Sequence, residues 1–109
     1  MARIYSLKGT QGTDPATAVD PHYNHLVVGV TYYTDDTYTT IATPLAGSIS
    51  IEGRVNGNSG WSVLTDSPID CTDSAASANT SIPLQEVRLI ATGLTAGVYY
   101  QATITANAH

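Results

Sequence analysis

Residues 86–106, EVRLIATGLTAGVYYQATITA, contain two alternating segments that are joined by a turn sequence with Gly93 and Gly97. In the second segment apolar or small side chains occupy every second position, at Val98, Tyr100, Ala102, Ile104 and Ala106. Tyrosine, glutamine and threonine occupy the positions between them. A period of two over this length is typical of a strand that buries one face and exposes the other. The stretch therefore predicts two β-strands and a β-rich fold.

The composition fits one small β domain. The chain has 109 residues, the size of a single domain, and 42% of them are hydrophobic, which is enough for one modest core. Phenylalanine is absent and only 12% of residues are charged, as is typical of extracellular or assembly proteins rather than helical metabolic enzymes. Cys71 is the single cysteine, so an intramolecular disulfide is excluded and the core or neighbouring chains must hold the fold.

The charge pattern argues against several classes of partner. The net charge is −5, and the four basic residues Arg3, Lys8, Arg54 and Arg88 are scattered, so we expect no direct contact with nucleic acid. The chain has neither a basic segment followed by an apolar run nor an apolar stretch long enough to span a membrane. We therefore expect no signal peptide and no membrane partner. Arg54 and Arg88, together with Glu52, are expected to form cross-strand or intersubunit ion pairs.

Further alternating segments lie in the middle of the chain. Residues 26–33 are predicted to form a central strand, and residues 38–43 its hairpin partner after a turn at 34–37. Residues 49–55 and 61–64 flank the turn sequence NGNSG and predict a second hairpin. Trp61, directly after that turn, is expected to anchor the core.

The two ends of this region are less regular. Residues 3–8 alternate and predict a short strand or arm, which a long loop follows, so we divide the chain into an N-terminal arm and loop, 1–24, and a body, 25–109. Residues 67–81 are rich in Ser, Ala, Asp and Thr and predict an exposed loop. About seven short strands with turns between them favour an all-β, antiparallel two-sheet β-sandwich of the immunoglobulin or fibronectin type III kind.

The residues 94–100, LTAGVYY, and the alternation after them resemble the L-x-P-G-x-x-Y run of fibronectin type III modules. The resemblance implies that Tyr100 is a corner tyrosine whose hydroxyl bonds to nearby backbone. Ala96 stands where the proline of that run is usual, and the chain ends at His109, before a further strand of such a module. The resemblance therefore implies that the N-terminal segment of this chain, or of a neighbour, covers the edge of the last strand.

A second resemblance covers residues 47–106. The order I-x-I-E-G-x-x-N-G-x-x-G-W-x-x-L at 49–64, a polar loop and then VRLIATGLTAG is similar to small bacteriophage virion proteins that decorate or cement capsids or tails. It implies a non-enzymatic virion protein, made in the host cytoplasm, that forms homo-oligomers and contacts the major capsid or other virion proteins. A weaker similarity to discoidin-type carbohydrate-binding sandwiches implies the alternative, a carbohydrate-binding or adhesion module with Tyr32, Tyr33 or Trp61 at its surface. A filament built by strand exchange is a third reading.

The virion hypothesis assigns roles to individual residues. The residues expected to lie against a neighbouring subunit are Ile4, Tyr5, Leu7, His22 and Tyr23. The residues expected to stabilise the body or its turns are Trp61, Tyr100, Gly57 and Gly97.

No pattern in the sequence predicts catalysis, a cofactor or a metal. His22 and His25 have the spacing of a metal pair but lack a third ligand nearby, and a pair of surface or interface imidazoles is favoured. Asp66, Asp70 and Asp73, with the hydroxyls of Ser67 and Thr72, could surround a calcium ion, but they lack the spacing of a calcium loop, so a solvated acidic loop is favoured. Neighbouring carboxylates disfavour a reactive thiolate at Cys71, and no nucleophile motif is present.

Overall fold

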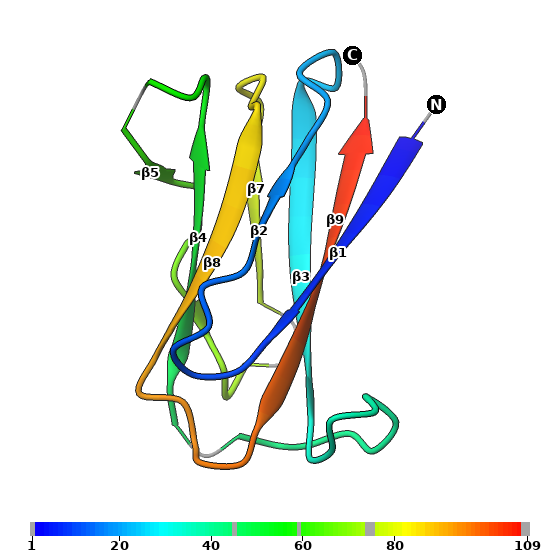
Figure 1. The fold of residues 1–109 in the computed structure, drawn as a ribbon, viewed down its shortest axis with the longest axis vertical. Coiled ribbons are helices and arrows are strands. Elements are labelled where there is room, and N and C mark those ends of the chain that lie inside the picture. Colours follow the sequence, from blue (N-terminus) through cyan, green and yellow to red (C-terminus); the bar gives the residue numbers. More distant parts are fainter. Residues whose placement is uncertain (1, 45, 59, 74–75, 108–109) are drawn as a thin grey trace.

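The computed structural model describes residues 2–44, 46–58, 60–73 and 76–107 as nine strands, with no helix in these ranges (Figure 1). The strands are β1 (Ala2–Gly9), β2 (Ala16–Ala18), β3 (His25–Tyr33), β4 (Ser48–Arg54), β5 (Ser62–Val63), β6 (Ile69–Asp70), β7 (Ser77–Thr80), β8 (Glu86–Thr92) and β9 (Tyr99–Asn107). All strand pairs are antiparallel and form two sheets. The predicted all-β antiparallel sandwich is confirmed.

The two sheets divide the strands unequally. One sheet has four strands in the order β1-β9-β3-β7 and is called the β9 sheet here. The other, the β8 sheet, has the order β2-β8-β4-β5, with β6 also paired to β4. Although β8 and β9 are consecutive, they belong to opposite sheets, and the turn between them contains Gly93 and Gly97 with φ of 65° and 79°. Glycine adopts these left-handed conformations without steric cost, which lets the chain cross from one layer to the other.

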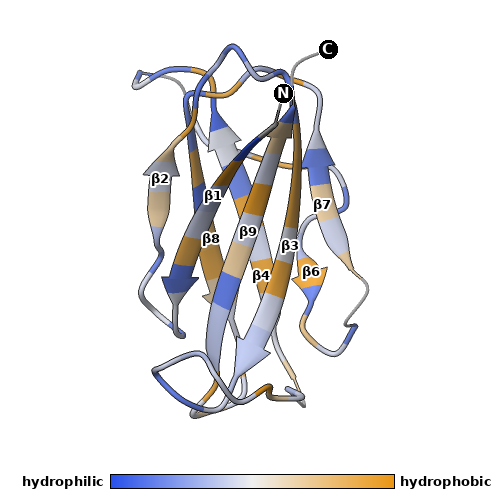
Figure 2. Cartoon of the chain, turned by 90° about the vertical axis from the view of Figure 1, so that its right-hand side faces the viewer, coloured by the Kyte–Doolittle hydropathy of each residue, from blue (hydrophilic) through white to orange (hydrophobic). Residues whose placement is uncertain are grey.

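The core lies between the inward faces of the two sheets. The largest fully buried side chains are Tyr100, Leu26, Ile49, Ile51, Leu89, Ile104, Val28 and Val87. They occupy alternate positions of β3, β4, β8 and β9, as the period of two requires. Figure 2 shows orange bands between paler ones along β9. Each fully buried aliphatic side chain stabilises the fold by about 1.5–3 kcal/mol.

Residues 1–24, expected to be an arm and a loop, contribute one strand to each sheet. β1 pairs with β9 from Ala2↔Asn107 to Gly9↔Tyr100, and β2 pairs with β8. Leu7 of β1 is also buried in the core. The edge of β9 is therefore covered by the N-terminal segment of its own chain.

Two segments differ from their predicted structure. Residues 38–43 do not form a strand, because hydrogen bonds from Thr39 and Thr40 to Asp35 close this segment into a loop. Only Ile41 makes an isolated bridge, to Tyr33. Residues 67–81, predicted to be an exposed loop, contain β6 and β7, and Cys71 and Ala78 are buried. β7 buries the small side chains Ala78 and Thr80, which do not produce a visible hydrophobic period, and β6 has only two residues, of which Ile69 is buried.

The second predicted hairpin is present but short. Glu52 pairs with Val63 and Gly53 with Ser62, so β5 has two residues. Gly57 in its turn does not have a positive φ, and a Cβ there would meet nothing within 4 Å. The expected conformational role for Gly57 is therefore not seen, whereas Gly97 has the positive φ of a turn glycine.

Truncating a side chain of β9 tests the packing. We expect Ile104→Ala, at a fully buried position, to lower the free energy of unfolding by about 2–5 kcal/mol because it leaves a cavity. Ile41→Ala, at a position that is 65% exposed, serves as the control and is expected to change it by about 0.5 kcal/mol or less. Urea unfolding of both variants measures the difference, and equal losses would contradict this core.

Candidate functional site

The two sheets differ in charge. The four strands of the β9 sheet contain Arg3 and Lys8 and no Asp or Glu. The whole chain has a net charge of −5, so the part outside these strands has −7. Of the two sheets in the described residues, the β9 sheet is therefore the one whose strands contain no carboxylate side chain.

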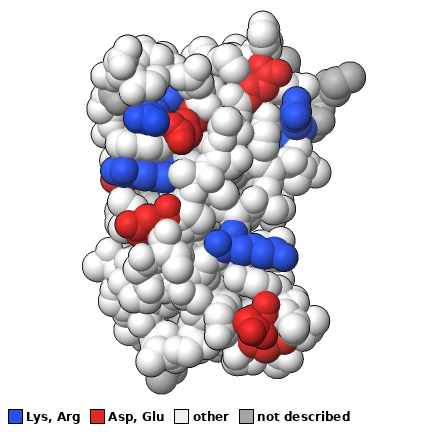
Figure 3. Space-filling view, viewed as in Figure 1, with Lys and Arg blue, Asp and Glu red and all other residues white. Residues whose placement is uncertain are grey.

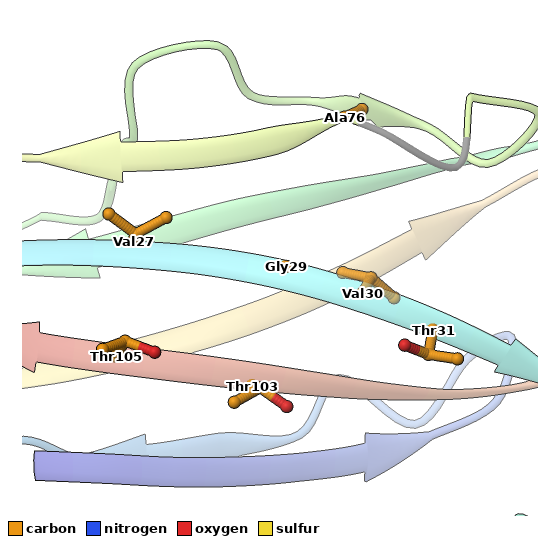
Figure 4. A pocket seen from close by; sticks show the side chains of 7 residues that line it. All are labelled: Val27, Gly29, Val30, Thr31, Ala76, Thr103 and Thr105. Carbon is orange, nitrogen blue, oxygen red and sulfur yellow. The ribbon is translucent and has the colours of Figure 1, made fainter.

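A hollow lies on the outer face of the β9 sheet (Figure 4). Its volume is about 350 Å³, and its walls come from β3, β9 and Ala76, the residue before β7. The residues that line it are Val27, Gly29, Val30, Thr31, Ala76, Thr103 and Thr105. The hollow lies where β7 begins, because Ser77, the first residue of β7, pairs with Gly29 of β3.

Gly29 forms the floor of this hollow although nothing in the fold requires a glycine there. It is the fifth of nine residues in β3, it does not have a positive φ, and a Cβ built on it would meet nothing within 4 Å. A glycine inside a strand costs stability and often marks a place where another molecule approaches the backbone closely. The floor is bare backbone that is open to the outside.

Three tyrosines close one end of the same face. The ring centroids of Tyr33 and Tyr38 are 5.4 Å apart and those of Tyr38 and Tyr99 are 6.1 Å apart, both edge to face. Tyr33 of β3 pairs with Tyr99 of β9, so the two rings come from neighbouring strands. The Lys8 ammonium lies 4.7 Å from the centroid of the Tyr38 ring, within cation–π range.

The loop that carries Tyr38 is built around the Asp35 carboxylate. This group accepts hydrogen bonds from the backbone N–H groups of Thr39 (3.1 Å) and Thr40 (3.0 Å) and from the hydroxyls of Thr37 and Thr39. These hydrogen bonds, those from the hydroxyls first, hold the pKa of Asp35 well below its ordinary value. Tyr38 itself has a φ of 57°, a conformation that costs free energy for a residue with a side chain. The loop thus holds Tyr38 over the end of the sheet.

The outer face of the β8 sheet has a different character. The Arg88 Nε lies 2.7 Å from Glu52 Oε1, and Arg54 pairs with Glu86 in the same way. Both guanidinium groups lie over the Trp61 ring, at 4.6 Å for Arg54 and 4.3 Å for Arg88. Positive and negative groups adjoin on the left of Figure 3, the side of β4 and β8 in this view. The expected ion pairs are therefore cross-strand pairs within one chain.

Trp61 does not anchor the core. It is only partly buried and lies outside the cluster of core side chains, because it follows the hairpin turn on the outward side of β4. Its apolar ring instead covers the two arginines.

Tyr100 is fully buried, but its hydroxyl does not make the backbone bond that a corner tyrosine would make. Among the described residues the hydroxyls of Tyr100 and Tyr32 make no hydrogen bond of normal geometry. The Thr13 hydroxyl lies beside that of Tyr100, and the Cys71 thiol lies beside that of Tyr32. Burial raises the pKa of Tyr100, and the Thr13 hydroxyl nearby partly offsets it. Tyr32 is only 6% exposed, so it is a core residue and cannot present its ring to a surface ligand as the carbohydrate alternative required.

The five residues expected to contact a neighbouring subunit fall into two groups. Ile4 is 66% exposed, and the His22 side chain is 91% exposed, with Nδ1 2.7 Å from Asp20 Oδ1. Leu7 is buried, Tyr23 packs against the core, and the Tyr5 hydroxyl accepts a hydrogen bond from the backbone N–H of Asp20. Only Ile4 and His22 therefore have side chains that are largely free for a partner.

The remaining candidate groups are the acidic and thiol side chains of the 66–73 region and the histidines. The described residues contain no group of three or more His, Cys, Asp and Glu side chains that could hold a metal. The Asp70 carboxylate accepts hydrogen bonds from the Thr72 N–H (2.9 Å) and hydroxyl (2.8 Å) instead. Burial raises the pKa of the Cys71 thiol, with a smaller contribution from Asp70. No helix that could span a membrane occurs in the described ranges.

A family model described as "Domain of unknown function (DUF7265)" matches residues 8–109. The chain belongs to this family. The match includes eight of the nine strands and the last residues of β1, so the family's common structure contains both sheets. A search of curated proteins gives no match.

Two solved structures share the fold. The SPBc2 prophage-derived protein YomS superposes with a TM-score of 0.65 at 15% identity, over 98% of this chain and 96% of YomS. The PBSX exported protein XepA superposes with a TM-score of 0.54 at 13% identity, over 96% of this chain and 38% of XepA. At such low identity these matches show a common fold, and the chain corresponds to somewhat more than a third of XepA.

Replacing Trp61 distinguishes a surface role from a core role. We expect Trp61→Ala to lower the free energy of unfolding by roughly 1–2 kcal/mol, since it removes two cation–π contacts that contribute about 0.5–1 kcal/mol each. A buried tryptophan would cost about 3–5 kcal/mol. Chemical denaturation measures the loss, and a value in the higher range would contradict the position described for Trp61.

Tyr100→Phe tests the buried hydroxyl. At neutral pH we expect a change of about 1 kcal/mol or less in the free energy of unfolding, because no hydrogen bond of normal geometry is lost. Since the folded-state pKa is raised, the neutral phenol contributes stability below the unfolded-state value of about 10 and loses it as the pH rises towards the folded-state pKa. The variant should therefore lose less stability in alkali than the parent. A loss of more than about 2 kcal/mol at neutral pH would point to a corner hydrogen bond.

Proposed function

We propose that this chain is a non-enzymatic structural subunit of a bacteriophage particle, and that it decorates the capsid. The observation that supports this most is the superposition with the prophage-derived YomS over nearly the full length of both chains. Because fold alone does not give function, the proposal also uses the surface of the chain itself.

The free edge of β1 is the attachment site in this proposal. β1 lies at the edge of the β9 sheet and pairs on one side only, with β9. It has eight residues without proline, and Ile4 within it is exposed. Such an edge is a template for pairing with a strand of another chain, here a capsid protein or a second copy in a homo-oligomer. An added strand extends the sheet in its own plane and leaves the outer face of that sheet open.

Decoration stabilises a particle through many bound copies. Many copies of a decorating protein bind at equivalent places on the capsid lattice. Each bound copy stabilises the assembled state by mass action. The capsid in turn gains contacts that bridge neighbouring subunits.

Purified particles test this function. We expect the chain to sediment with capsids in a fixed ratio to the major capsid protein, measured by quantitative mass spectrometry of separated heads and tails. Ile4→Lys should lower its incorporation several-fold because it places a charge in the contact, whereas Ile82→Lys, also at an exposed isoleucine, should not. Both variants are first checked for an unchanged melting temperature.

Two outcomes would contradict the proposal. If the chain is absent from purified particles, the structural role is wrong. If it is present only in the tail fraction, the virion role holds and decoration of the capsid is wrong.

A further inference from the structure

We propose that the hollow over Gly29 binds an oligosaccharide, with an acidic sugar next to Lys8. This binding activity goes beyond the proposed structural role and does not depend on it. It uses the outer face of the β9 sheet, whereas attachment to the particle uses the edge of β1.

The size of the face favours a small ligand over a protein partner. Four strands spaced by about 4.8 Å and some seven residues long at about 3.3 Å each span roughly 400 Å². A stable protein interface requires about 800 Å² on each partner, twice this area. The hollow itself, at about 350 Å³, lies within the range of small-molecule sites.

The chemistry of the walls fits a sugar. Thr31, Thr103 and Thr105 supply hydroxyls that both donate and accept hydrogen bonds, as sugar hydroxyls do. Val27 supplies an apolar patch beside them, and the bare backbone at Gly29 allows a ring to approach closely. Figure 4 shows these side chains arranged along β3 and β9, so they lie on either side of a path that follows the strands.

The three tyrosines define one end of this path. From Tyr33 to Val27 the strand advances by six residues, or about 20 Å, which gives room for several sugar units in a row. Tyrosine presents a flat apolar ring with a polar tip, and sugars have apolar ring faces with polar edges. The loop held by Asp35 keeps Tyr38 in place without a ligand, so little ordering free energy is lost on binding.

Charge selects among the saccharides. The outward residues Lys8, Ser6 and Ile4 of β1 pair with Gln101, Thr103 and Thr105 of β9. Among these residues only Lys8 carries a charge. No Asp or Glu lies in the strands of this sheet, so a sugar carboxylate over the strands meets the Lys8 ammonium and no strand carboxylate. Asp35 and Asp36 lie in the loop that carries Tyr38, and the Asp35 carboxylate accepts four hydrogen bonds within that loop. A neutral glycan would lack this attraction.

The experiment uses two probes, the hexamer of galacturonic acid and the hexamer of glucose. We expect the acidic hexamer to bind and to shift the amide NMR signals of Gly29, Thr31, Thr103 and Thr105. We expect the neutral hexamer to bind about tenfold more weakly, a difference of about 1.4 kcal/mol. Higher salt should reduce this difference because the Lys8 contact is exposed.

Two variants separate the ligand site from folding. Gly29→Val fills the floor of the hollow without a clash, so we expect binding to fall at least about tenfold while the melting temperature stays equal or rises. Gly57→Val is the matched control, since its added side chain also meets nothing within 4 Å but lies in the β4–β5 turn. Lys8→Gln should remove the preference for the acidic hexamer and leave the weaker neutral binding.

Three results would overturn the inference. They are the absence of binding by both hexamers, signal shifts confined to another surface, and unchanged binding by a folded Gly29→Val variant. None of them bears on whether the chain is found in particles, so this failure and that of the proposed function can be told apart.

Discussion

The pairing of β9 on both of its sides is the interaction on which the rest of the structure depends. β9 pairs with β3 over nine residues and with β1 over eight, and this register turns Ala102 and Ile104 into the core. The same register turns Thr103 and Thr105 outward. A slip of one residue would exchange the two sets. The core and the hydroxyl-lined outer face are therefore consequences of one alignment.

The sequence predicts those strands whose alternation is long. The core face of β9 could be assigned from residues 98–106 alone, and β3, β4 and β8 were found in the same way. The strands that were missed have two to four residues, as in β6 and β7, and bury small side chains such as Ala78. Alternation also does not identify a strand's partner. That β8 and β9 lie in opposite sheets follows from packing and from the turn at Gly93 and Gly97.

The candidate site could not be predicted because it depends on that pairing. Gly29 and Thr103 are far apart in the chain and become neighbours only through the register of β3 and β9. One signal was available: a glycine in the middle of an otherwise apolar strand, which nothing local explains. The sequence predicts a strand at Tyr38, whereas hydrogen bonds to Asp35 hold it in a loop against the other tyrosines. The sequence also favours a core position for Trp61, whereas its ring lies over arginines on the outside.

Our proposals assign two kinds of contact to two separate surfaces of the fold. The free edge of β1 is available for strand addition, while the uncharged hollow lies beyond β9 on the outer face. A cryo-electron microscopy reconstruction of the phage particle tests this division most directly. The account predicts density for this sandwich on the capsid, with the β1 edge against a capsid strand and the face over Gly29 toward solvent. A capsid without this density, or one in which the Gly29 face is buried against the shell, would contradict it.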